Sequence, residues 1–428
     1  MTRPTIGFAG MTHLGIVSAT AAAARGFPVV AFDTDPVQVA ALAAGELPIV
    51  EPGLPQLLLH HRERVSFTTT PAHLRACAVV YVATDVPVDQ TGASDLQPVR
   101  DLTELVAGNL AGKTTLVILS QVPPGFTRGL GRPEAHTFYQ VETLVFGRAV
   151  ERALEPERFI VGCGDPAATL PGPLAEYLEA FGCPILHMRY ESAELAKISI
   201  NTCLVASITA ANTLAELCEH IGADWSEIVP ALRLDRRIGP HAYLTPGLGL
   251  GGGNLERDLE TVCRLADANG TDAGVVRAWT ANSAHRRDWA LTQIHERVVP
   301  WIEEPVLAVL GLAYKENTAS TKNSPALALL TALAPFVVRA YDPVVMPQPE
   351  FHPRLVAAPS ALEACTGADA VVLMTPWPEF RELRPDTIAA RLRRRTVIDP
   401  HRLLDGPACR AAGLDHVTLG YPLPRTAA

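Results

Sequence analysis

Glycines near the start of the chain are spaced as in a turn that binds phosphate. The apolar run 5–9 is followed by Gly10, Thr12 and Gly15, and then by the helix-like segment "IVSATAAAARG". A tight turn between a strand and a helix points backbone N–H groups at a phosphate, and the helix dipole adds to that attraction. Thr12 replaces the second glycine of the usual G-x-G-x-x-G pattern, so it must be tolerated near the pyrophosphate or contact it.

A carboxylate follows the next apolar run at the spacing of a dinucleotide site. Asp33 ends the run 29–32, roughly 20 residues after the turn begins. A carboxylate there accepts hydrogen bonds from the adenosine ribose and repels a 2′-phosphate, which favours NAD over NADP. The alternative is a glycine turn with an aspartate that caps a helix. We predict NAD as the cofactor, bound by Gly10, Thr12, Leu14, Gly15 and Asp33.

A second glycine-rich segment, "PGLGLGGGNLERDL", occupies residues 246–259. So much glycine indicates backbone that passes close to a flat ligand or adopts positive φ. Asn254 closes the run. Its amide either hydrogen-bonds a substrate hydroxyl or carbonyl, or simply suits a left-handed turn.

The elements that must position these residues follow a β–α rhythm. Apolar runs at 5–9, 29–32, 79–83, 115–120, 158–162 and 184–188 predict strands, and a second series lies at 306–311, 336–341, 370–375 and 396–399. Between the two series we expect a long helix from 191 to about 222 and further helices over 255–269 and 273–301. The predicted fold is α/β, with two Rossmann-like doubly wound parallel-sheet domains joined by a central helical region. The predicted boundaries are 1–188, 189–302 and 303–428.

Composition excludes several partner classes. The net charge of −9 disfavours nucleic acid and anionic membranes as partners. The apolar stretch 198–215 contains too many polar residues for a lipid-facing span, and the N-terminus lacks a secretory pattern. The eight cysteines show no CxxC pair or zinc spacing, so we expect reduced thiols, a cytoplasmic location and no metal site.

Six longer stretches, in one order over nearly the whole chain, resemble the UDP-glucose/GDP-mannose dehydrogenase family. They are "ELPIVEPGL", "ERALEPERFIVG", "ESAELAKISINTCLVASITAANTLAEL", "GLGLGGGNLERDL", "VLGLAYKENTASTKNSPAL" and "YDP". The resemblance implies an N-terminal NAD domain, a central region that forms a homodimer and a C-terminal domain that helps bind a sugar nucleotide. Family members oxidise a sugar CH₂OH to a carboxylate in two NAD-dependent steps, with a cysteine thiol capturing the intermediate aldehyde.

The resemblance also assigns site residues. Lys197, Asn201, Asp258 and Glu142 match its catalytic positions; an ammonium, an amide and carboxylates can orient a hydroxyl and move its proton. Lys197 and Asn201 stand at i and i+4, so they leave one helix face together, although a plain surface pair is the alternative. Gln121 and Lys322 join the cofactor-binding residues, Lys322 at the position of an arginine expected to reach the sugar nucleotide. Substrate-binding positions are Gly249, Gly251, Gly252, Arg257 and Lys315.

The departures from the family pattern concern the second oxidation step, in which the aldehyde becomes a carboxylate. The family loop reads roughly GFGGSCFPKD, and its cysteine falls on Asn254, which cannot form a thiohemiacetal. The glutamate thought to activate water falls on Phe146, a threonine on Gln121 and the loop lysine on Arg257. Neither Cys203 nor Cys263 obviously replaces the lost thiol.

These losses predict an enzyme that oxidises a carbinol and goes no further. A ketone acidifies its neighbouring C–H, so a base can then cause epimerisation or loss of water, and hydride return makes the cycle redox-neutral. The leading hypothesis is such an epimerase or dehydratase acting on a nucleotide sugar or a related nucleoside or sugar phosphate. Alternatives are a two-electron dehydrogenase that releases NADH and a non-catalytic NAD-binding homologue. Four-electron oxidation to a uronate is the least favoured.

Overall fold

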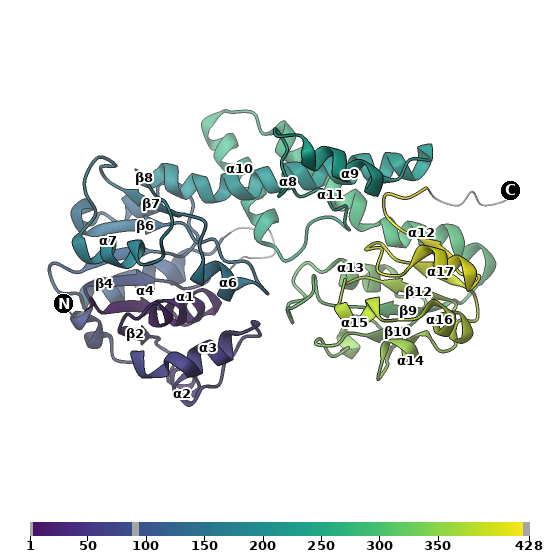
Figure 1. Ribbon diagram of the computed structural model, residues 1–428, viewed down its shortest axis with the longest axis horizontal. Coiled ribbons are helices and arrows are strands. Elements are labelled where there is room, and N and C mark those ends of the chain that lie inside the picture. The colour runs from purple at the N-terminus through teal and green to yellow at the C-terminus, as the bar shows by residue number, and fades with distance from the viewer. Residues whose placement is uncertain (1–2, 88–93, 423–428) are drawn as a thin grey trace. The chain divides into compact units, whose positions relative to one another are not determined.

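The computed structural model describes residues 3–87 and 94–422, and the chain divides into two compact units at 200/201. Figure 1 colours the first unit purple to teal and the second teal to yellow. The long helix α8 (Tyr190–Ile221) begins in the first unit and continues into the second. The two units are described in turn.

The first unit is built on an eight-stranded sheet with the order β3-β2-β1-β4-β5-β6-β7-β8. Its first six strands follow the 3-2-1-4-5-6 order of a dinucleotide-binding fold, in which a ligand crevice opens between the carboxyl ends of the first and fourth strands. The strands are β1 (Ile6–Ala9), β2 (Val29–Phe32), β3 (Val65–Thr68), β4 (Val79–Val82), β5 (Thr115–Ile118), β6 (Thr137–Gln140), β7 (Phe159–Cys163) and β8 (Ile185–Arg189).

One strand pair departs from the predicted parallel sheet. β6 and β7 are antiparallel, with Tyr139 opposite Gly162, whereas every other described pair in this sheet is parallel. The connection between β6 and β7 contains one short helix, α6 (Ala149–Leu154), and returns the chain to the sheet edge that it left. Antiparallel neighbours need no full crossover, which explains the reversal.

Helices cover both faces of this sheet because side chains alternate along each strand. Phe8 and Tyr81 face a core shared with α1, α2, α3, α6 and α7, whereas Val80 and Val82 face a core shared with α4, α5 and the start of α8. The remaining bounds are α1 (His13–Ala24), α2 (Pro36–Ala44), α3 (Leu54–His61), α4 (Gln97–Gly108), α5 (Phe126–Gly129) and α7 (Gly172–Glu179).

The second unit carries a six-stranded sheet, entirely parallel, with the order β11-β10-β9-β12-β13-β14. This is again the 3-2-1-4-5-6 order, so both predicted Rossmann-like sheets are confirmed. The strands are β9 (Val306–Leu310), β10 (Val337–Tyr341), β11 (Leu355–Ala357), β12 (Ala370–Leu373), β13 (Thr396–Ile398) and β14 (Asp415–Val417). The helices are α9 (Trp225–Leu234), α10 (Asn254–Asn269), α11 (Gly274–Arg287), α12 (Trp289–Arg297), α13 (Pro325–Ala332), α14 (Ala361–Cys365), α15 (Pro378–Arg381), α16 (Pro385–Arg391) and α17 (Gly406–Ala411).

The long helix matches its prediction to within one residue at each end. By length and apolar composition α8 passes the test for a membrane span, the one helix of the described residues to do so. However, its Glu194, Lys197 and Asn201 side chains are buried inside the protein. Placing charged side chains in lipid costs free energy, so this helix is better explained as a core element of the protein.

Candidate functional site

The glycine turn after β1 leaves no room for side chains at its two retained glycines. Gly10 has φ +93°, and a Cβ there would lie 3.0 Å from the Thr84 backbone after β4. A Cβ on Gly15 would lie 1.8 Å from the carbonyl oxygen of Gly10. The turn is therefore pressed against the end of β4, in the crevice where the fold places a dinucleotide.

Thr12 is tolerated in this turn because its backbone is extended (φ −78°, ψ −172°) and needs no glycine. Its hydroxyl donates to the carbonyl of Ala83 (3.3 Å) and accepts from the amide of Asp85 (3.0 Å). The threonine thus ties the turn to the segment after β4. Leu14 is buried in α1, so it offers a cofactor only its backbone.

Asp33 follows β2 and is half-buried beside the turn. One carboxylate oxygen accepts from the Met11 amide (2.6 Å) and the other from the Asp35 amide (3.0 Å). These bonds fix the carboxylate at the end of β2, which is the position suited to ribose hydroxyls. Gln121 lies after β5 and is half-buried.

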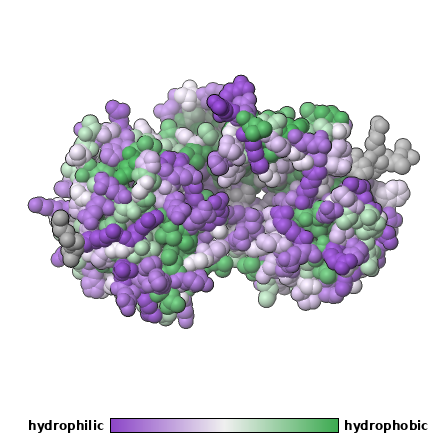
Figure 2. Space-filling model, in the orientation of Figure 1, coloured by the Kyte–Doolittle hydropathy of each residue, from purple (hydrophilic) through white to green (hydrophobic). Residues whose placement is uncertain are grey.

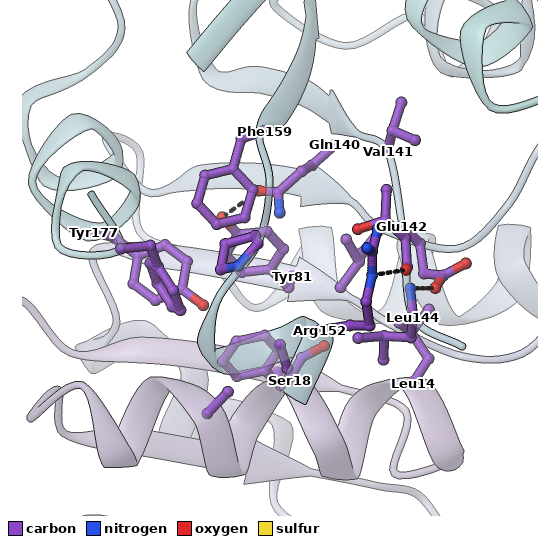
Figure 3. Close-up of a pocket in the computed structure, with 17 residues that line it drawn as sticks. Leu14, Ser18, Tyr81, Gln140, Val141, Glu142, Leu144, Arg152, Phe159 and Tyr177 are labelled. Carbon is purple, nitrogen blue, oxygen red and sulfur yellow. Dashed lines mark hydrogen bonds between the residues drawn. The ribbon is translucent and has the colours of Figure 1, made fainter. Parts of the chain in front are cut away.

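Lys197 and Glu142 form an ion pair at the same carboxyl edge of the first sheet. The Lys197 ammonium lies 3.3 Å from a Glu142 oxygen, and the lysine is only 9% exposed. Glu142 lies two residues after β6, on a segment that lines a cavity of about 50 Å³ (Figure 3). On the other side of that cavity the Tyr81 hydroxyl donates to the Gln140 side chain (2.9 Å), which holds the segment in place.

The position of the family's second glutamate holds an aromatic ring packed on a histidine. The Phe146 ring centroid lies 4.2 Å from that of His13, the first residue of α1. His13 pairs with Glu51 (3.0 Å), and Glu51 also accepts from the amides of Gly147 (3.0 Å) and Ala149 (2.8 Å). Sequence reasoning missed His13 and Glu51, although Glu51 lies within the quoted "ELPIVEPGL" stretch.

In the second unit, Asn201, Arg257 and Asp258 form a buried cluster. The Asn201 amide donates to one oxygen of Asp258 (2.5 Å), and the Arg257 Nε lies 3.3 Å from the other. All three are at most 8% exposed. Arg257 therefore offsets the charge of a carboxylate that would otherwise be costly to bury.

Four of the five glycines of the 246–259 segment lie against other parts of the protein. A Cβ on Gly249 would lie 2.4 Å from the Ser283 carbonyl oxygen, and a Cβ on Gly252 would lie 2.6 Å from the Tyr314 ring. Both have positive φ, as does Gly253. A Cβ on Gly251 would also approach Tyr314, and the Lys322 stem lies against Gly253. The positive φ values agree with the prediction. The flat group that this backbone approaches is the ring of Tyr314, and that ring lies 5.6 Å from the Lys315 ammonium.

Asn254 is the first residue of α10, and its side chain is exposed. The left-handed residues at this corner are Gly252 and Gly253, and Asn254 itself is not among the positive-φ residues. The interpretation of Asn254 as a left-handed turn residue is therefore wrong. Its side chain stands at a helix N-terminus, where unpaired N–H groups favour a partial negative charge.

A larger pocket of about 540 Å³ opens in the second unit at the carboxyl ends of β9, β12 and β13. It combines an aromatic side chain with several cationic ones, and its lining includes Trp225, Arg233, Glu316, Arg381, His401 and Arg402. Arg402 is held by Asp224 (2.9 Å). The His401 ring donates to the Met374 carbonyl (3.1 Å), and desolvation by burial lowers its pKa, which disfavours the charged form of the ring. An aromatic face beside guanidinium groups suits a nucleotide. The sequence analysis did not identify the residues of this pocket.

Two doubly wound sheets, a glycine turn before a helix and a carboxylate after the second strand define the class of NAD-dependent oxidoreductases. Family models support a narrower assignment. The NAD-binding domain of the UDP-glucose/GDP-mannose dehydrogenase family matches residues 4–176, its central domain 191–284 and its UDP-binding domain 308–406. The chain belongs to this family.

Relatives match over almost the whole chain. A UDP-glucose 6-dehydrogenase from Pseudomonas aeruginosa is 31% identical, covering 97% of each chain, and UDP-glucose 6-dehydrogenase TuaD from Bacillus subtilis is 28% identical, covering 97% of this chain and 93% of its own. A UDP-glucose dehydrogenase structure from Pyrobaculum islandicum has a TM-score of 0.82 at 26% identity, covering 95% of this chain and 98% of its own.

Proposed function

We propose that this enzyme uses NAD to take one hydride from a carbinol of a nucleotide sugar, or of a related nucleoside or sugar phosphate, and does not oxidise it further to a carboxylate. The observation that supports this most is the exposed amide of Asn254 at the N-terminus of α10. A cysteine there would have its thiol pKa lowered by the helix terminus and could capture an aldehyde. A carboxamide has no such nucleophilic atom.

Among the described residues of the second unit, no cysteine near Asn254 is placed to substitute. Cys263 lies nine residues further along α10, about two and a half turns, so it leaves the opposite side of that helix. It packs in an apolar cluster with Leu259 and Val276. Cys203 lies two residues beyond Asn201, roughly 200° around α8. Neither thiol shares a helix face with the residues assigned to catalysis.

The group for the second half of the acid-forming reaction is also replaced. Hydrolysis of a thioester needs a base that activates water. Phe146 is packed on His13 and supplies no proton acceptor. The loss of two groups that serve only acyl chemistry, with retention of the proton-transfer groups, supports a function that ends at the carbonyl.

Lys197 and Glu142 are the proposed proton-transfer pair. NAD, when bound at the glycine turn after β1, would supply the hydride acceptor and, in a redox-neutral cycle, the hydride donor. The pair takes the hydroxyl proton as the carbonyl forms, and the same groups can remove the acidified proton from the adjacent carbon. Returning that proton to the other face gives an epimer, whereas departure of a β-hydroxyl as water gives a dehydrated sugar. The epimerase or dehydratase hypothesis therefore rests on the retained 3.3 Å ion pair.

A second candidate is a two-electron dehydrogenase that releases NADH. Its support is the relatives, which are named as dehydrogenases. The two candidates share the first step and differ in the fate of the hydride.

The test is a panel of UDP- and GDP-sugars incubated with the purified protein and NAD in heavy water. The redox-neutral proposal expects a carbon-bound deuteron in the product, by mass spectrometry, without net absorbance at 340 nm. One NADH per carbonyl product would instead establish the two-electron candidate. A uronic acid with two NADH per sugar would overturn the proposal, because it requires the acyl chemistry that Asn254 and Phe146 lack.

A further inference from the structure

Glu142 of the proposed proton-transfer pair lies on a segment that has left the sheet. β6 ends at Gln140, and the Val141 amide still donates to the Ile160 carbonyl of β7 (3.0 Å). Residues 142–145 have no regular secondary structure. The position of the Glu142 carboxylate therefore depends on contacts other than strand pairing.

The start of this segment is fixed by a buried side-chain bond. The Tyr81 hydroxyl donates to the Gln140 side chain (2.9 Å), and Tyr81 is only 1% exposed. The Tyr81 ring stacks on Phe8 with 5.1 Å between the ring centroids, which holds the hydroxyl in place. Burial raises the pKa of Tyr81 well above its usual value, so the hydroxyl keeps its proton and remains a donor. The chain thus leaves β6 from a fixed point, two residues before Glu142.

Arg152 contacts the middle of the segment from α6. Its Nε donates to the Thr143 carbonyl (3.4 Å), as Figure 3 shows. A second nitrogen of the same guanidinium donates to Glu157 (2.6 Å), which restricts where the guanidinium can move. Arg152 therefore connects α6 to the backbone directly after Glu142.

The peptide group that Arg152 contacts is also the one that orients the Glu142 carboxylate. The Thr143 carbonyl and the Leu144 amide belong to one peptide group, and the Leu144 amide donates to one carboxylate oxygen of Glu142 (Figure 3). The other oxygen of that carboxylate lies 3.3 Å from the Lys197 ammonium. A peptide group is planar, so a donor on its oxygen restricts the direction of its N–H. A hydrogen bond to the carbonyl also strengthens the N–H as a donor.

We infer that Arg152 is a positioning residue for Glu142, acting through this peptide group to keep the carboxylate in contact with Lys197. Arg152 itself does not touch the reacting atoms. The effect on catalysis rests on the proposed function, whereas the contact between the two side chains can be measured without turnover.

The test is zero-length cross-linking of the purified protein with a water-soluble carbodiimide, which joins a carboxylate to an amine that touches it. The Lys197 and Glu142 side chains are 11% and 16% exposed, so the reagent can reach them. Peptide mass spectrometry gives the yield of the Lys197–Glu142 amide, and its loss in Glu142→Gln confirms the assignment. We expect Arg152→Met to lower this yield several-fold. Arg152→Lys keeps the charge beside Glu157 but lacks the Nε–H, and it should lower the yield as well.

The matched control is Arg158→Met. Arg158 donates to the same Glu157 (2.8 Å), so the control removes a charge from the same carboxylate and leaves the bond to the Thr143 carbonyl in place. Its cross-link yield should equal that of the unmodified protein, and thermal melting confirms that each variant is folded. An unchanged yield in both Arg152 variants would overturn the inference. An equal fall in Arg158→Met, or no cross-link in the unmodified protein, would do the same.

Kinetics then separate positioning from structural support. On a sugar nucleotide that turns over, Arg152→Met should lower kcat by about tenfold or more and leave KM almost unchanged, because only the proton-transfer step loses its geometry. A raised KM with full kcat would contradict the inference. Loss of the cross-link without turnover of any sugar nucleotide by the unmodified protein would support the inference and count against the proposed function.

Discussion

At the scale of single residues, the Lys197–Glu142 pair carries the proposed proton transfer. We predict that Lys197→Met lowers kcat by roughly 10²- to 10⁴-fold, the range of general acid–base catalysis, while the Kd for NAD changes little. Steady-state kinetics and calorimetry check this once a substrate is in hand. Lys113→Met, which removes an exposed lysine of the same unit, is the control and should keep full activity. Equal losses in both variants would contradict the assignment.

The Asn254 position offers a trapping experiment. We expect Asn254→Cys to accumulate a covalent adduct with a terminal aldehyde, because the restored thiol at the helix N-terminus adds to the aldehyde as a thiohemiacetal. A second NAD would take the hydride that converts this adduct to a thioester, and Phe146 supplies no base to hydrolyse that thioester. Intact-protein mass spectrometry would show the added mass of the sugar nucleotide. Adding Phe146→Glu should release it as an acid. An Asn254→Cys variant that stays unmodified during turnover would indicate oxidation at a ring carbon.

The sequence could indicate which residues belong to the candidate site, but it could not indicate which of their side chains contact each other. The turn glycines, Asp33 and Lys197 follow from local pattern and family resemblance. The contact of Lys197 with Glu142 joins residues from α8 and the end of β6, and the Phe146–His13 contact joins a loop to α1. Such pairs depend on tertiary packing, which one sequence does not encode as a local signal.

At the scale of elements, the glycine segment before α10 allows a paired comparison. Gly252→Ala should lower the free energy of unfolding by about 1–3 kcal/mol, since it forces positive φ on alanine and drives a Cβ toward Tyr314. Gly247→Ala meets open space and ordinary φ, so its effect should stay within about 0.5 kcal/mol. Urea denaturation measures both. A similar loss in the two variants would show that the segment tolerates no side chain for some other reason.

The helices of the second unit share a buried charge. Glu219 on α8 accepts from Arg286 on α11 (2.8 Å), from the Trp289 indole on α12 (2.9 Å) and from the Gly420 amide (2.9 Å). Glu219→Ala leaves Arg286 buried without its main partner and should cost about 3–5 kcal/mol of unfolding free energy.

Tryptophan fluorescence can follow that unfolding selectively. All five tryptophans lie in the second unit, at positions 225, 279, 289, 301 and 377. Glu216→Ala, at a more exposed partner of the same arginine, should cost less than about 1 kcal/mol. Equal costs would mean that burial does not govern the strength of this contact.

Most strands could be predicted because buried parallel strands are continuous apolar runs. The missed ones lack that signal. β3, β11 and β14 stand at sheet edges and are partly exposed, and β14 begins "DH". β6, "TFYQ", is buried but half polar. The predicted helix 273–301 is divided into α11 and α12 at Asp288, a boundary that no proline or glycine marks.

At the scale of the whole molecule, we predict a homodimer. Exposed apolar side chains gather on the second half of α8 and on α9, namely Leu214, Leu217, Ile221, Ile228 and Leu234. Figure 2 shows hydrophobic surface over this part of the chain. Leu217→Asp combined with Leu234→Asp should give a monomer by analytical ultracentrifugation, since a charge in an apolar interface is costly. Val37→Asp, an exposed apolar residue of the first unit, is the control and should leave the dimer intact.

The change of strand direction between β6 and β7 determines where Lys197 of α8 lies. β8 ends at the edge of the sheet where β6 begins, with β7 between them, and the Tyr190 hydroxyl there donates to the Thr137 carbonyl (2.6 Å). Lys197 lies seven residues further along α8, roughly 10 Å of helix, and its ammonium there contacts Glu142 beyond the end of β6. One residue added to this part of α8 would rotate the Lys197 side chain by about 100° around the helix axis. The strand reversal therefore fixes the height along β6 at which α8 brings Lys197 to Glu142.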